Sequence, residues 1–311
     1  MLGLGLSLTV ADFKRVVVYP RAVVLGLFCQ MLLLPLGCYA IAVAFRLPPE
    51  LAVGLMLLSA SPGGATANLY SHLARGDVAL NVTLTAVNSV LSVFTLPLIV
   101  EIAMRRFLSE AQRIPLQFEK VVQVFAIVLV PVLVGMVIRR LRPAFAFRLH
   151  KPVKIFSAVV LVLVVLVIMV VGATDKSRAS DTGMFMRSVL PALTFNVASM
   201  AIGYFVPLLA RVPRRQAVAI GMEIGIHNGT LAIALATGLL KSTTMAIPAA
   251  VYSGIMFFTA GIFGYVASRK LRDEPRSVVV YRSMSPDATP PAEASGSAAK
   301  AIDEVPRASS V

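Results

Sequence analysis

The segment 211–240 constrains this chain most, because it places an acid in the middle of an apolar run. Its sequence, RVPRRQAVAIGMEIGIHNGTLAIALATGLL, is long enough to cross a bilayer once. Glu223 lies near the centre of that run, and His227 follows one helical turn later. An ionised side chain at that depth costs roughly 3 kcal/mol on insertion scales unless something compensates it. The segment therefore predicts a membrane-embedded functional site and not a plain span.

The residues around the acid favour a break in the helix over 221–229. Gly221, Gly225 and Gly229 allow the helix to unwind, and Asn228 adds a polar side chain. Unwound backbone is tolerated at membrane depth only where it lines a cavity or is buried in protein. Secondary transporters build ion sites from such broken helices. We expect Glu223 to coordinate a cation or carry a proton, and a purely structural pairing with a buried polar group is the alternative.

Composition indicates an all-α polytopic membrane protein. The 311 residues are 58% hydrophobic and 14% charged. The apolar runs have helical length and lack the alternation of a membrane barrel. The net charge of +14 lies mainly between the apolar spans, which indicates a lipid bilayer as partner and argues against nucleic acid. Cys29 and Cys38 share one apolar span and are expected as free thiols, and the absence of HExxH and CxxC argues against a zinc enzyme.

The chain divides into a transmembrane domain, 1–268, and a charged tail, 269–311, that is expected to be disordered. The domain is expected to hold roughly eight spans after an N-terminal half helix, since the apolar run before Asp12 is about half the length of a span. This short start resembles the second half of a helix whose beginning is missing. The denser basic loops predict a multi-pass inner (plasma) membrane protein with a cytoplasmic C-terminus. Expected spans are 21–45, 78–103, 121–138, 155–171, 188–210 and 246–267.

A second break is predicted at SPGGATAN, residues 61–68, where Pro-Gly-Gly interrupts an apolar segment. A span with a central amide, Gln30, precedes this break, and a span with Asn196 precedes the break around Glu223. The two broken helices are expected to enter from opposite sides of the membrane. This arrangement predicts an inverted-repeat secondary transporter with two crossed discontinuous helices.

Polar side chains gather beside the first break. Asn81, Thr85 and Asn88 fall on one face of the following helix, and Asn68 ends the break itself. Asn68, Asn81 and Thr85 are each either interhelical glue or a ligand, and so are Gln30 and Asn196. The half-helices that begin after Gly64 and Asn228 present free backbone N–H groups, which favour an anion such as an organic carboxylate.

Three stretches together carry a family resemblance: LGLSLTVADF (4–13), SPGGATANLYSHLARGDVALNVTLTAVNSVLS (61–92) and GMEIGIHNGTLA (221–232). They resemble the bile acid:sodium symporter family over residues 1 to about 267. The resemblance implies a core domain with the two crossed helices, a panel domain, and Na⁺ coupled to uptake of bile acids or smaller organic acids. Compared with the ten helices of the family, the first helix and part of the second are expected to be missing here.

The resemblance also implies site residues. One Na⁺ would be held by Asn68, Asn81, Thr85 and Glu223. A second Na⁺ would be held by Gln30, Glu223, the carbonyls of Ile224 and Ile226, and His227. Substrate would lie near Ala65, Thr66 and Asn228.

Two departures from the family pattern bear on these sites. PGGATAN stands where the family has PGGTASN, so Ala67 replaces a serine ligand, for which Asn81 compensates. His227 replaces the usual glutamine, and imidazole is a poor Na⁺ ligand, which puts the second site in doubt and leaves H⁺ coupling open.

The sequence therefore predicts a Na⁺-coupled transporter, and not an enzyme, for an organic anion that is either bile-acid-like or a small carboxylate such as a keto acid or a pantoate-like compound. Three alternatives remain open: a proton-coupled carrier, an arsenite-permease-like exporter and a truncated membrane protein that does not transport. The exporter is expected to carry a cysteine near the first break, and residues 59–68 contain none. The sequence does not indicate an oligomeric state.

Overall fold

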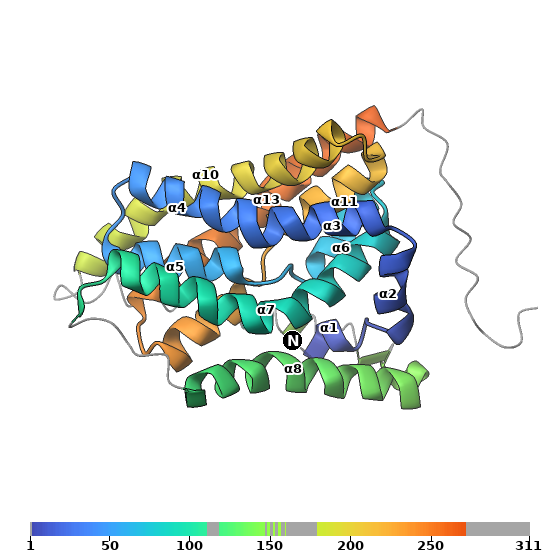
Figure 1. The fold of residues 1–311 in the computed structure, drawn as a ribbon, viewed down its shortest axis with the longest axis horizontal. Helices are drawn as coiled ribbons and strands as arrows, with labels where there is room; N and C mark the ends of the chain where they lie inside the picture. Colours follow the sequence, from blue (N-terminus) through green and yellow to red (C-terminus); the bar gives the residue numbers. More distant parts are fainter. Residues whose placement is uncertain are drawn as a thin grey trace, which may run out of the picture. The chain divides into compact units, whose positions relative to one another are not determined.

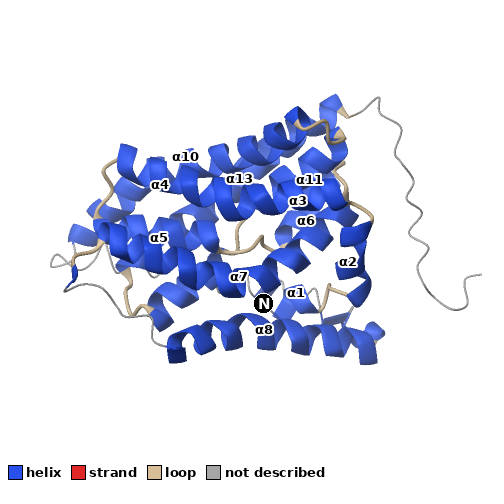
Figure 2. Ribbon diagram, in the orientation of Figure 1, coloured by secondary structure: helices blue, strands red, loops and turns tan. Residues whose placement is uncertain are grey.

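The computed structural model describes residues 2–110, 118–146 and 179–271, with positions 148, 149, 152, 155, 156 and 159 between them. Within these residues the regular structure is helical, and no strand is longer than an isolated backbone bridge (Figure 2). This confirms the all-α prediction. In chain order the helices are α1 (Leu2–Gly5), α2 (Val10–Lys14), α3 (Pro20–Phe28), α4 (Leu34–Ala44), α5 (Pro49–Ala60), α6 (Thr66–Leu73), α7 (Val78–Phe107), α8 (Phe118–Leu141), α10 (Ala179–Leu209), α11 (Arg214–Gly225), α12 (Gly229–Ala234) and α13 (Ile247–Lys270).

Four helices of the described part are long and apolar enough to cross a membrane: Pro20–Ala44, Val78–Phe107, Gly183–Leu209 and Thr244–Arg269. Each contains or overlaps an expected span. Two shorter apolar helices, Pro49–Ala60 and Gly229–Leu239, belong to the broken segments. Most of the expected span 155–171, residues 111–117 of the connector before α8, and the tail from 272 onward lie outside the described residues.

The first long helix, Pro20–Ala44, is continuous but irregular at its centre. Its turn Cys29–Leu33 is π-helical, with α3 before it and α4 after it. Pro35, which follows at the start of α4, lacks the N–H that a regular helix would use there. The wider turn carries Gln30, and π turns of this kind recur at functional sites.

The two breaks are shorter than expected. The first covers residues 61–65, so Ala67 and Asn68 already belong to α6. The second covers residues 226–228, because α11 continues through Gly225. Gly221 and Gly225 therefore do not unwind the helix, and instead they allow α10 to approach α11. A Cβ on Gly225 would lie 2.3 Å from the Met200 Cγ, which is closer than packing permits.

The loops that lead into the two broken segments match each other closely. Arg46 ends α4 at φ 47°, and Arg211 ends α10 at φ 60°, both left-handed. In each case the following residue donates a backbone hydrogen bond to the preceding helix: the Leu47 N–H to the Ala42 carbonyl (3.0 Å) and the Val212 N–H to the Pro207 carbonyl (2.9 Å). Both loops thus close a helix end with the same left-handed cap.

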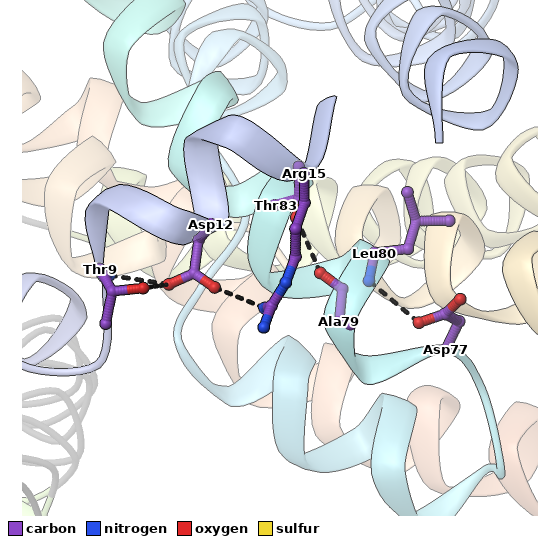
Figure 3. Close-up of polar contacts among 7 residues, drawn as sticks. All are labelled: Thr9, Asp12, Arg15, Asp77, Ala79, Leu80 and Thr83. Carbon is purple, nitrogen blue, oxygen red and sulfur yellow. Dashed lines mark hydrogen bonds and ion pairs between the residues drawn. The ribbon is translucent and has the colours of Figure 1, made fainter. Parts of the chain in front are cut away.

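Helix α2 contacts α7, and Figure 3 shows the polar contacts within each of the two elements. Asp12 accepts hydrogen bonds from both the backbone N–H and the hydroxyl of Thr9 (2.7 Å each) and pairs with Arg15 (2.6 Å). Asp77 caps α7 by accepting the Leu80 N–H (3.1 Å), and its own N–H donates to the Arg215 carbonyl (2.9 Å). The two hydrogen bonds of Asp77 fix the start of α7, which carries Asn81, Thr85 and Asn88.

Among the described residues, buried apolar side chains form two clusters. The larger one joins α3–α7 with α10–α13 and includes Val128 of α8. The smaller one contains Leu4, Leu8, Ala86 and Val132 and connects the N-terminal segment and α8 to α7. Figure 1 shows α1 lying along α8, where a Cβ on Gly5 would lie 2.2 Å from the Val132 carbonyl oxygen. The N-terminal segment and α8 thus pack tightly on each other, and both also contact α7.

Candidate ion-binding site where the two broken helices cross

The two breaks pair with each other through their backbones. Gly63 and His227 form an antiparallel bridge. On either side of it, the Gly64 N–H donates to the Ile226 carbonyl (2.7 Å) and the Asn228 N–H donates to the Pro62 carbonyl (2.9 Å). Unpaired backbone groups inside a membrane cost several kcal/mol each, so this pairing permits two unwound segments at the same depth.

Glu223 lies at this crossing and is fully buried. The Thr85 Oγ1 lies 2.5 Å from Glu223 Oε2, and the Asn88 Nδ2 donates to Oε1 at 3.4 Å. The ion pairs among the described residues, Asp12–Arg15 and Glu101–Arg105, do not involve this carboxylate. Its described partners are therefore neutral donors, and a cation would supply the charge compensation that a buried carboxylate requires.

Unpartnered amide oxygens accompany the carboxylate. Asn81 donates its Nδ2 to the Ala219 carbonyl (2.7 Å), which joins α7 to α11 and leaves the Asn81 Oδ1 buried without a partner. The Oδ1 of Asn68 on α6 is likewise buried and unpartnered. A buried oxygen without a donor is costly unless a cation or water occupies the space beside it.

Gln30 and His227 meet at one carbonyl. The Gln30 Nε2 donates to the Ser61 oxygen (3.1 Å), and the His227 Nδ1 lies 3.2 Å from the same oxygen. The Gln30 Oε1 and the His227 Nε2 remain without partners. The imidazole stacks on Phe195, with ring centroids 5.7 Å apart, and meets Tyr252 edge-on at 5.4 Å. His227 therefore holds the crossing in place and makes no hydrogen bond to Glu223.

The end of α11 is fixed by side chains from two other helices. The Gly225 carbonyl accepts hydrogen bonds from the Asn196 Nδ2 and from the Tyr252 hydroxyl, both at 2.9 Å. The Thr259 hydroxyl donates to the Asn196 Oδ1 in turn. Asn196, a candidate for either ligand or structural glue, is thus structural in this arrangement.

The expected substrate residues lie at the two half-helix starts and are partly exposed. Ala65 precedes α6 and packs against the smaller apolar cluster, and Thr66 begins that helix. Asn228 caps α12, because its Oδ1 accepts the Leu231 N–H (3.1 Å) and the Thr230 hydroxyl (2.8 Å). These three positions are more open than Glu223, as contact with a substrate requires.

The structure also identifies contributors that were not among the expected ligands. Asn88 contacts Glu223 directly, and its place on the Asn81–Thr85 face was the available signal. Gly63 leaves room for the carboxylate, because a Cβ there would lie 2.2 Å from Glu223 Oε1. Tyr252, an apolar-span residue, carried no such signal.

The donor set suits an alkali cation. No group of three or more His, Cys, Asp or Glu side chains that could hold a metal ion occurs within the described ranges. The oxygens at the crossing come from a single carboxylate, amides and a hydroxyl, which are hard ligands of low total charge.

Comparison with known proteins finds a sodium symporter family and relatives named as sodium-dependent transporters. The family model described as Sodium Bile acid symporter family matches residues 1–176. The chain is 27% identical, over 81% of its length and 75% of the relative's, to "Uncharacterized sodium-dependent transporter YocS" of Bacillus subtilis (strain 168). It is 28% identical to "Probable sodium/metabolite cotransporter BASS2, chloroplastic" of Oryza sativa subsp. japonica, over 81% of the chain and 58% of the relative. It is also 28% identical to the Arabidopsis thaliana protein named BASS1, over 88% and 67%.

Proposed function

Because this chain belongs to the sodium bile acid symporter family, we propose that it is a secondary transporter that couples Na⁺ movement to transport of an organic anion. The family and the relatives are transporters, so the protein is a multi-pass membrane transporter and not an enzyme. The observation that carries the proposal is the Glu223 carboxylate, which is fully buried at the helix crossing with neutral donors as its partners.

We assign the first Na⁺ to Asn68, Asn81, Thr85 and Glu223. Two of these side chains have buried oxygens without partners, which is the electrostatic condition for a cation ligand. Thr85 has an alternative acceptor, because its hydroxyl also lies 2.9 Å from the Asn81 carbonyl. Turning the hydroxyl proton to that carbonyl frees the Oγ1 lone pairs for Na⁺ at little cost.

The second expected set, Gln30, Glu223, Ile224, Ile226 and His227, has weaker support. The Ile226 carbonyl already accepts the Gly64 N–H at 2.7 Å. His227 offers a nitrogen in place of an amide oxygen, and its Nδ1 is committed to the Ser61 carbonyl. Na⁺ prefers oxygen ligands. We therefore propose one strong Na⁺ site centred on Glu223, with H⁺ coupling through His227 as the competing hypothesis that the test below separates.

The proposed substrate is a small organic carboxylate at Ala65, Thr66 and Asn228. Helices α6 and α12 begin at these residues, and helix starts attract anions. Two of the relatives carry the name sodium/metabolite cotransporter, which favours a metabolite-sized acid over a bile acid.

Alternating access would arise from a panel, formed by the N-terminal segment and α8, moving against a core formed by α3–α7 and α10–α13. Their contacts include the small apolar cluster and the α8 residue Val128, which is part of the larger cluster, and relative motion of the two parts would have to break these contacts. The matched caps at Arg46 and Arg211 favour an inverted repeat as the source of the two crossed helices. The density of basic loops favours a cytoplasmic C-terminus in an inner (plasma) membrane.

The test is ²²Na⁺ binding to purified protein, followed by carboxylate uptake into proteoliposomes under an imposed Na⁺ gradient. Wild type should bind Na⁺ saturably and accumulate the acid only when Na⁺ is present. The Glu223→Gln variant should lose the high-affinity Na⁺ class and Na⁺-driven uptake. Uptake that follows a proton gradient and ignores Na⁺ would replace Na⁺ by H⁺, and uptake by Glu223→Gln at the wild-type rate would end the assignment of Glu223.

A further inference from the structure

A small cavity beside the crossing shares only Gln30 with the two residue sets discussed above. It is lined by Gln30, Asn88, Ser92 and Thr95, with the apolar side chains Ala60 and Pro62 among its other walls. Asn88, Ser92 and Thr95 follow one another along α7, so the cavity extends from the Glu223 contact toward the Arg105 end of that helix. Its volume is about 10 Å³, which is room for a single water-sized occupant.

The two amides of this cavity are fixed with their oxygens free. The Gln30 Nε2 is held by the Ser61 carbonyl and the Asn88 Nδ2 by Glu223 Oε1. Both side chains are almost fully buried, with exposures of 4% and 1%. Both amide oxygens are buried without a hydrogen-bond partner, and both side chains line the cavity.

The two hydroxyl groups that line the cavity also have their hydrogens engaged elsewhere. The Ser92 hydroxyl donates to the Ser89 carbonyl (3.0 Å), and the Thr95 hydroxyl donates to the Leu91 carbonyl (3.3 Å). Each hydrogen is thus used within α7, and the oxygen lone pairs remain available. The polar atoms left for the cavity are acceptors, and an occupant has to bring positive charge or its own hydrogens.

We propose that this cavity binds one Na⁺ through Gln30, Asn88 and Ser92, with Thr95 as a further lining residue. The site is separate from the one assigned to Asn68, Asn81, Thr85 and Glu223, and His227 takes no part in it. It rests on the proposed Na⁺ coupling and places the second cation on the α7 side of the crossing. Asn88 links the two sites, because its Nδ2 donates a hydrogen bond to Glu223 while its Oδ1 has no partner and its side chain lines the cavity.

The chain offers a matched pair of double variants for the test. Ser92→Ala/Thr95→Val removes the two cavity hydroxyls and nearly preserves side-chain volume. Ser89→Ala/Thr83→Val removes two buried hydroxyls from the same helix, which also donate to helix carbonyls, at residues that do not line the cavity. A loss of Na⁺ binding that comes from weaker helix packing should therefore appear in both double variants, whereas a loss of cavity ligands should appear only in Ser92→Ala/Thr95→Val.

The measurement is ²²Na⁺ binding isotherms and stoichiometry for wild type, both double variants and Glu223→Gln. We expect wild type to show two Na⁺ classes, and the cavity variant to lose one class or bind it at least about tenfold more weakly, since a hydrogen-bonding ligand to a charge is worth about that much. The Ser89→Ala/Thr83→Val control should match wild type. Glu223→Gln should retain the cavity class, because the amide oxygen that the substitution introduces still accepts from Asn88.

Two outcomes overturn the inference and are distinguishable. Wild-type binding by the cavity variant, with loss of all Na⁺ in Glu223→Gln, would mean that the cavity holds water and that the proposed function stands alone. No saturable Na⁺ binding by wild type would remove both the cavity site and the proposed Na⁺ coupling.

Discussion

The backbone of Gly63 passes so close to Glu223 that residue 63 has no room for a side chain. A Cβ at this position would lie 2.2 Å from Oε1 and 2.4 Å from the carboxyl carbon. The φ angle of Gly63 is not positive, so the glycine is needed for space and not for backbone conformation. The Pro-Gly-Gly break thus forms one wall of the carboxylate site and does more than interrupt a helix.

Gly63→Ala should therefore displace the Glu223 carboxylate and weaken Na⁺ binding by at least about tenfold, which corresponds to about 1.4 kcal/mol. The bridge to His227 uses backbone atoms, so the fold should survive the change. Isotherms with ²²Na⁺ measure the effect. Gly261→Ala is the control, since nothing lies within 4 Å of a Cβ at that position in α13. Equal Na⁺ affinity in both variants would contradict the described position of the carboxylate.

Thr85→Val should reduce Na⁺ affinity about tenfold or more, because it removes the hydroxyl that lies 2.5 Å from Glu223 and keeps the side-chain shape. Thr83→Val offers a close comparison. Thr83 is buried on the same helix and also donates to a helix carbonyl, that of Ala79 (2.9 Å), but it does not contact Glu223. Na⁺ titrations followed by thermal shift would rank the two variants. A similar loss in both would show that Thr85 acts through helix packing.

The sequence was most informative where one residue type has one physical meaning inside a membrane. An acid at mid-span and Pro-Gly-Gly in an apolar run both indicated the crossing, and both lie there. Apolar length located the four long helices for the same reason.

It was less informative where one residue type serves two purposes. Gly221 and Gly225 were expected to unwind the helix, yet they make room for α10, and sequence alone does not distinguish these uses because Met200 lies far away in the chain. The orientation of His227 likewise depends on Phe195 and Tyr252, which come from two other helices. Such contacts exist only once the helices have packed.

Tyr252→Phe should destabilise the protein by about 0.5–1.5 kcal/mol, because the Gly225 carbonyl loses one of its two side-chain donors. The ring contacts with Phe195 and His227 would remain. Thermal unfolding in detergent should show a lower midpoint, with Na⁺ affinity changed less than by Thr85→Val. Tyr265→Phe on the exposed side of α13 is the matched control. A midpoint equal to that of the control would mean that Asn196 alone holds the carbonyl.

His227→Gln tests whether the imidazole limits cation binding at the crossing. A glutamine would supply an amide oxygen near Gln30 and the Ser61 carbonyl, where His227 presents a nitrogen. We expect Na⁺ binding to gain affinity or one further equivalent. Because the ring also stacks on Phe195, the variant should have a lower unfolding midpoint, and His227→Leu separates these effects by removing the ring without adding an oxygen. If His227→Gln and His227→Leu bind Na⁺ alike, the residue serves packing, and the second cation must be held elsewhere, as it would be by Gln30, Asn88 and Ser92.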